Sequence, residues 1–176
     1  IRKISLEPGQ VIQYANFQVE YEKFEKKVKA RQEAIISAML KSLNMPEDRS
    51  PDIKRQCGRI VTAFAQDIRE KKEEGRFIDL LNRLLIGSII HDDSRANWKD
   101  ALSLFRSLLV PLISSVEILS LAENLFQMAQ MLLAEILERR EAVRRYQNKR
   151  LYLETNGLIK RVHSCLEIEK LRFVLS

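Results

Sequence analysis

The residue types that ligate metals or act as nucleophiles are scarce here, since the chain holds two His and two Cys. His91, followed by Asp92 and Asp93, is the one cluster of metal-ligand types. Three adjacent residues do not easily point at one ion, and no second ligand set with HxxxH spacing accompanies them. We therefore interpret the cluster as a loop between helices, in which Asp93 or Ser94 caps the following helix.

Haem ligation by His91 or His163 is a second chemistry to weigh, because sensor globins are helical and close to this size. His163 follows Arg161 in a charged helical stretch, and His91 is flanked by acids. Neither surrounding suits a porphyrin. The sequence therefore predicts no metal and no cofactor, with a haem or small-ligand sensor left open as an alternative.

The two cysteines do not suggest catalysis. Cys165 lies two positions from His163, which places the pair on different sides of a helix and out of hydrogen-bond reach. There is also no GxGxxG motif and no P-loop. Cys57 and Cys165 have apolar helical neighbours and no CxxC spacing, so we expect buried free thiols in a reducing compartment. We predict that the chain is not an enzyme.

Composition favours an all-helical fold. Of 176 residues, 45% are hydrophobic and 31% charged, while Gly (5) and Pro (4), which favour turns, are rare. No signal peptide is present, and no apolar run approaches the length of a membrane span. These features predict a cytoplasmic protein without a membrane contact. Because the chain begins with Ile, we also expect it to be a piece of a longer protein.

The elements that must position these residues follow from apolar periodicity and turn formers. Pro8-Gly9 indicates an extended lead-in over residues 1–12, before a bundle over 13–115. Two prolines mark a loop at 44–51, Gly75 is expected to be a left-handed helix cap, and Pro111 ends or kinks the fourth helix. The bundle helices are predicted at 13–43, 51–74, 76–90 and 96–111.

The last third, 116–176, has the clearest pattern. Between Val116 and Phe173 there is no proline and one glycine, and apolar residues recur every three or four positions. An unbroken helix of that length would be roughly 85 Å long, too long to bury its whole stripe within this domain. The fold class predicted is thus all-α: a bundle of about four to six helices with a long, coiled-coil-like C-terminal helix. The alternative is a helix that breaks near Gly157 and folds back into a compact six-helix domain.

The long stripe predicts a partner, and we expect a second copy of the chain in a homodimer. Substitution of Leu125 by Arg should then break the assembly. The predicted dimer interface consists of Phe17, Tyr21, Phe24, Val28, Ile118, Leu121, Leu125, Met128, Leu132 and Ile136.

A basic run in the same helix is a candidate anion-binding surface. One interpretation is a phosphate-binding helix that follows nucleic acid. The other, which we favour, is a solvated helix face whose arginines lie over apolar neighbours, because the base-reading motif of a leucine-zipper protein is absent. The candidate anion-binding residues are Arg139, Arg140, Arg144, Arg145, Lys149 and Arg150.

Two resemblances add to this interpretation. The segments Val61–Ile68 and Asp100–Leu109, with the Leu-rich stretch between them, resemble the helical N-terminal input domains of bacterial signalling proteins, including stressosome-type regulators. Leu158-Ile159, followed by Cys165–Leu175, resembles the helix that leads into a GAF-type sensor domain.

These resemblances imply a sensory or scaffolding bundle that is often dimeric and precedes an effector domain. They carry over no functional residue. We therefore expect a non-enzymatic regulatory and dimerisation module of a multidomain signalling or transcription-regulatory protein. It would transmit a bundle rearrangement through a paired long helix to an effector or sensor domain after Ser176. The alternatives are a nucleic-acid-binding helical adaptor and the ligand sensor named above.

Overall fold

The computed structural model describes residues 8–43, 50–72, 75–90 and 97–174, and all secondary-structure elements in these ranges are helices. Side chains are described for 15–43, 51–72, 75–87, 97–160, 162 and 163. No strand occurs in these ranges, so the predicted all-α class is confirmed. The helices are α1 (Pro8–Leu43), α2 (Ser50–Glu70), α3 (Arg76–Ile90), α4 (Trp98–Leu109), the 3₁₀ turn η2 (Val110–Leu112) and α5 (Val116–Val174).

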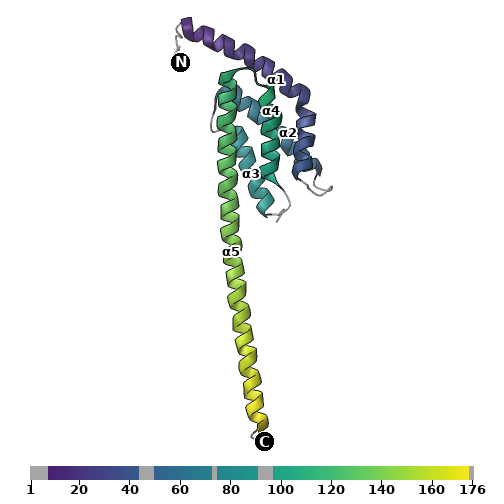
Figure 1. Cartoon of the computed structure of the whole chain (residues 1–176), viewed down its shortest axis with the longest axis vertical. Helices are drawn as coiled ribbons and strands as arrows, with labels where there is room; N and C mark the ends of the chain where they lie inside the picture. The colour runs from purple at the N-terminus through teal and green to yellow at the C-terminus, as the bar shows by residue number, and fades with distance from the viewer. Residues whose placement is uncertain (1–7, 44–49, 73–74, 91–96, 175–176) are drawn as a thin grey trace, which may run out of the picture. The chain divides into compact units, whose positions relative to one another are not determined.

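The chain divides into two units, Ile1–Ile136 and Leu137–Ser176. The first is a helical bundle that contains α1 to α4, η2 and the beginning of α5 (Figure 1). The second contains the remainder of α5. The boundary therefore falls after Ile136 instead of after residue 115, because the buried positions of α5 continue as far as Ile136.

Helix α1 begins earlier than the sequence suggested. The predicted extended lead-in is wrong from Pro8 onward, and residues 1–7 lie outside the described part. Proline is well tolerated in the first turn of a helix, where its missing N–H would have no partner. Pro8 therefore begins a helix here and does not form a turn.

Four phenylalanines from four helices form the centre of the bundle core. Phe64 of α2 packs against Phe77 of α3, Phe105 of α4 and Phe126 of α5, with ring centroids 5.1, 5.3 and 4.8 Å apart. All four side chains are at most 3% exposed. Rings at these distances gain about 0.5–1.5 kcal/mol per pair beyond the area they bury. Phe126 thus makes the start of α5 part of the core.

The turn between α2 and α3 differs from the prediction. Helix α2 ends at Glu70, and Lys71 adopts the left-handed conformation with φ 53°, whereas no described glycine has a positive φ. Gly75 is therefore not the left-handed helix cap that was predicted, and glycine is required there for a steric reason. A Cβ at this position would lie 2.2 Å from Cγ of Asp67, so only glycine fits beside that carboxylate.

Gly75 lies close to Asp67 because the carboxylate of Asp67 binds the beginning of α3. This carboxylate is buried and accepts hydrogen bonds from the backbone N–H groups of Arg76 (3.1 Å) and Phe77 (2.7 Å). These donors open α3 and have no partner within their own helix. A carboxylate at this end is also favoured by the helix dipole. Asp67 of α2 therefore caps α3.

Helix α4 is capped by Asn97, whose Oδ1 accepts from the N–H of Asp100 at 3.3 Å. The predicted caps, Asp93 and Ser94, lie outside the described residues, as does most of the predicted loop at 44–51. Helix α4 passes into η2, which contains Pro111. The predicted end of the fourth helix near this proline is confirmed.

Helix α5 runs without interruption through Gly157. Nothing lies within 4 Å of a Cβ built there, and the φ of Gly157 is not positive. The alternative with a break near Gly157 and a folded-back end is therefore wrong. The predicted long C-terminal helix is confirmed.

Candidate interaction surface

The predicted dimer stripe lies inside the bundle. Seven of its ten residues are at most 7% exposed within a single chain, and Leu121, Met128 and Leu132 are half-buried. A side chain that is already covered offers no area to a second chain. For seven of these residues the assignment to a dimer interface is therefore corrected, because they pack α1 and the start of α5 into their own core, while for the three half-buried residues it stays a prediction. The seven are Phe17, Tyr21, Phe24, Val28, Ile118, Leu125 and Ile136.

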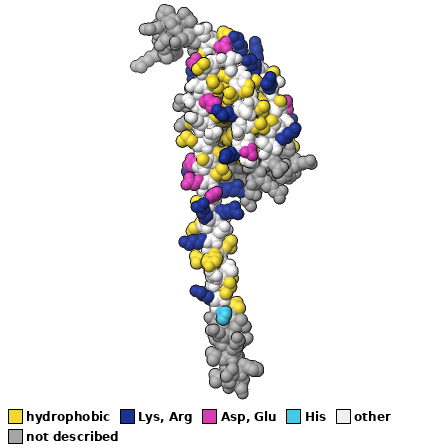
Figure 2. Space-filling model, viewed as in Figure 1, with side chains coloured by type: hydrophobic (Ala, Val, Ile, Leu, Met, Phe, Trp, Pro, Cys, Tyr) yellow, Lys and Arg dark blue, Asp and Glu magenta, His cyan; other side chains and the backbone are white. Residues whose placement is uncertain are grey.

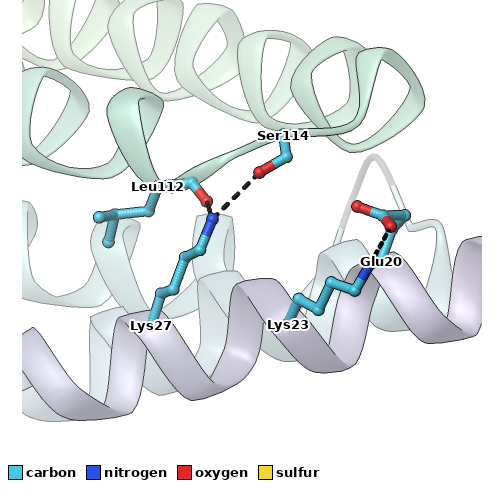
Figure 3. A network of polar contacts seen from close by, with 5 residues as sticks. All are labelled: Glu20, Lys23, Lys27, Leu112 and Ser114. Carbon is cyan, nitrogen blue, oxygen red and sulfur yellow. Dashed lines mark hydrogen bonds and ion pairs between the residues drawn. The ribbon is translucent and has the colours of Figure 1, made fainter.

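Polar contacts fasten the beginning of α5 to the bundle. Lys27 of α1 donates to the carbonyl oxygen of Leu112 (3.2 Å) and to Oγ of Ser114 (3.0 Å), as Figure 3 shows. The neighbouring Lys23 pairs within its own helix with Glu20 (2.6 Å). Lys27 thus connects α1 with the segment that joins η2 to α5.

A second lysine contacts the first turn of α5. Nζ of Lys71 lies 2.6 Å from Glu117 and 4.1 Å from the ring centroid of Phe17, so it joins α1, α2 and α5. Further along, the guanidinium of Arg106 in α4 makes a bidentate pair with Glu123 in α5, at 2.9 to 3.2 Å. Exposed ion pairs contribute less than about 1 kcal/mol each. They orient the helix more than they stabilise it.

The residues that first suggested chemistry do not form a site. Cys57 is a buried free thiol, as predicted, and burial raises its pKa to about 11, which makes it a poor nucleophile. His163 is exposed on α5, while His91 and its acidic neighbours and the side chain of Cys165 lie outside the described part. Among the described residues, no three His, Cys, Asp or Glu side chains are placed to share a metal ion.

Most of the large hydrophobic side chains that are exposed among the described residues lie in the second unit. Among the described residues, 13 large hydrophobic side chains are exposed, and eight of them lie in residues 139–163, which we call the basic segment. Figure 2 shows these side chains interspersed with Lys and Arg along the helix. They are Val143, Tyr146, Leu151, Tyr152, Leu153, Leu158, Ile159 and Val162.

The basic segment also accounts for the net charge of the chain. It holds eight Lys and Arg and two Glu, hence a net charge of +6, and the 22 basic and 22 acidic residues elsewhere cancel. Five of the six candidate anion-binding residues are exposed, and Arg140 is half-buried. Both glutamates pair within the helix, Glu141 with Arg145 (3.0 Å) and Glu154 with Arg150 (2.9 Å).

The exposure of this apolar surface is not predictable from periodicity. Periodicity groups the apolar residues of α5 into one stripe, although most of those before residue 137 are buried or half-buried and the large ones from Leu137 to Val162 are exposed. The sequence does indicate apolar residues on more than one face of the helix, since Leu151, Tyr152 and Leu153 are consecutive. Three consecutive apolar residues on a helix cannot share one face.

The helices of the described ranges lack the combination of length and hydrophobicity needed to cross a bilayer. Comparison with known proteins finds no matching family model, no matching curated protein and no matching solved structure.

Proposed function

We propose that the chain is a non-enzymatic regulatory and dimerisation module, whose basic segment pairs with the same segment of a second copy. The observation that supports this is the exposure of eight large hydrophobic side chains on one helix. A helix in a protein gains most of its stability from packing of its apolar face against other elements. A partner that covers these side chains would therefore stabilise the segment as a helix.

One line of residues in the segment has the spacing of a coiled-coil seam. Leu151, Thr155, Leu158 and Val162 follow one another at alternating steps of four and three, and Asn148 precedes Leu151 by three. In a parallel pair, Asn148 lies opposite its own copy. A buried Asn at such a position favours one register and two strands, at some cost in stability.

Regulation would follow from the way the bundle holds α5. Lys27 of α1 holds the segment that leads into α5, and Lys71, at the end of α2, pairs with Glu117 in the first turn of α5. A rearrangement of those helices would shift or rotate α5 and so bias an effector or sensor domain that follows Ser176. The resemblance to bacterial helical input domains leads to the same proposal. A reduced, buried Cys57 suits a cytoplasmic location.

The first test is the mass of the chain in solution, measured by light scattering coupled to gel filtration over a dilution series. We expect a dimer, against 20.6 kDa for the monomer. The double substitution Leu151→Gln and Leu158→Gln should yield the monomer, because it removes the seam while glutamine keeps a high helix propensity.

Met131→Gln is the matched control. Met131 is also exposed on α5, at 72%, yet it precedes the basic segment. This variant should keep the mass of the parent chain. A monomeric parent chain at every concentration, or a double variant that still dimerises, would contradict the proposal.

A further inference from the structure

The apolar residues of the basic segment point in three directions. Leu151, Tyr152 and Leu153 are consecutive and 61%, 67% and 61% exposed. Consecutive residues of an α-helix are about 100° apart, so these side chains face three sides of the helix.

Each of the three has an apolar companion seven positions away. Leu158 follows Leu151, Ile159 follows Tyr152, and Tyr146 precedes Leu153. Residues seven apart lie on nearly the same face of a helix. The segment thus carries three apolar stripes, and every residue in them is exposed.

A second copy covers one of these stripes. In a two-stranded coiled coil each helix buries a single seam, which the proposed pairing assigns to Leu151 and Leu158. The stripes of Tyr146 with Leu153 and of Tyr152 with Ile159 then remain exposed. A helix with apolar residues on all sides is typical of one that is enclosed by neighbours.

Charge identifies the kind of neighbour. A pair of basic segments already brings two charges of +6 together, and further copies would add more of the same sign. Like charges in contact are unfavourable, while complementary potentials favour association. The occupant of the remaining stripes must therefore be acidic as well as apolar.

The same distribution disfavours two other anionic partners. A helix that lies on a membrane has one apolar and one polar face, whereas here apolar side chains occur in all three directions. Nucleic acid would neutralise the arginines but would leave every remaining apolar stripe in water. An acidic amphipathic helix pairs with the arginines and also covers one of these stripes.

We propose that the basic segment is a docking site for an acidic amphipathic helix of a partner protein, which packs on the stripe of Tyr146 and Leu153 and pairs its carboxylates with the flanking arginines. This rests on the proposed function only in assigning the stripe of Leu151 and Leu158 to the second copy. The recognition is that of a helix laid along an apolar stripe with a charged rim.

The test is a calorimetric titration of the full chain with a three-heptad peptide that has Leu and Ile at its seam positions and Glu at the flanking ones. A second peptide carries Gln in place of every Glu. We expect the acidic peptide to bind at least ~10-fold more tightly than the Gln peptide, and this preference to shrink as salt is added.

Substitutions then locate the site. The double variant Tyr146→Gln and Leu153→Gln should weaken binding of the acidic peptide by more than ~10-fold and keep the solution mass of the parent chain. Met131→Gln should change neither. Equal affinity for the two peptides, or unchanged binding by the double variant, overturns the proposal.

Duplex DNA is the third probe. Binding of DNA that is as tight as that of the acidic peptide, with neither affected by the double variant, would show a polyanion surface and overturn the proposal. The solution mass is an independent measurement. A monomer that binds the acidic peptide through Tyr146 and Leu153 refutes the dimer and leaves the docking site intact.

Discussion

At the scale of single residues, Tyr21 shows how one polar atom fastens α1 to the bundle. Its side chain is 2% exposed, and its hydroxyl donates to the carbonyl oxygen of Ala65 in α2 at 3.0 Å. Burial, with a smaller contribution from the charge of Glu25, raises the pKa of Tyr21 to about 12. A buried phenol that keeps its proton also keeps its hydrogen bond.

This pKa shift predicts a pH dependence of stability. The folded-state pKa lies above the unfolded value of 10.0, so the contribution of Tyr21 is fully present below pH 10 and is lost as the pH rises towards about 12. Tyr21→Phe should lower the free energy of unfolding by about 1 kcal/mol at pH 8. It should also reduce the loss of stability between pH 10 and pH 11, as measured by urea unfolding.

Tyr146→Phe is the control for that experiment, because Tyr146 is 71% exposed and its hydroxyl makes no hydrogen bond among the described residues. It should match the parent chain at both pH values. If Tyr21→Phe leaves the alkaline part of the stability curve unchanged, the hydrogen bond to Ala65 does not act as described.

At the scale of elements, the turn between α2 and α3 depends on two residues that fit each other. Asp67 caps α3 from the preceding helix, and Gly75 leaves the space that its carboxylate occupies. Lys71 takes the left-handed position between them. The geometry of the turn therefore belongs to the pair of helices and not to either one alone.

Gly75→Ala should therefore destabilise the bundle by about 1–3 kcal/mol, because the new methyl group displaces Asp67 and leaves the first N–H groups of α3 without an acceptor. Gly87→Ala is the matched control within α3. No atom lies within 4 Å of a Cβ at that position, and alanine favours the helix by about 0.5–1 kcal/mol. Thermal unfolding followed by circular dichroism measures both changes, which are expected to have opposite signs.

At the scale of the whole molecule, α5 serves two purposes along its length. Up to Ile136 most of its apolar residues complete the core around Phe126. From Leu137 to Val162 its large apolar side chains are exposed and accompanied by arginines. One continuous helix thus belongs to the bundle and also carries the proposed interaction surface.

The substitution Leu125→Arg tests whether the first part of α5 belongs to the core of the bundle. Leu125 is 1% exposed, so an unpaired charge there should cost at least ~3 kcal/mol and unfold the bundle, instead of dissociating a folded dimer as the stripe alone suggested. Thermal unfolding should show the loss of a cooperative transition. A folded, stable Leu125→Arg variant would show that this part of α5 is not core, and Met131→Arg should remain folded.

The sequence by itself determined the class and most helices of this protein, because helix propensity, caps and breakers act over a few neighbouring residues. The helix over 76–90, the end of the fourth helix near Pro111 and the long C-terminal helix were all predictable in this way. The buried thiol of Cys57 followed from its apolar neighbours for the same reason.

Only the tertiary structure decided which apolar residues are core and which are surface. The apolar residues of α5 recur with the same period before and after Ile136. Such a period indicates that a helix has an apolar face, but it does not indicate what covers that face. The pairing of Asp67 with Gly75 could not be predicted either, because it depends on how α2 and α3 meet in space. Burial within one chain covers seven of the ten predicted dimer residues, whereas eight large apolar side chains of residues 139–163 are exposed.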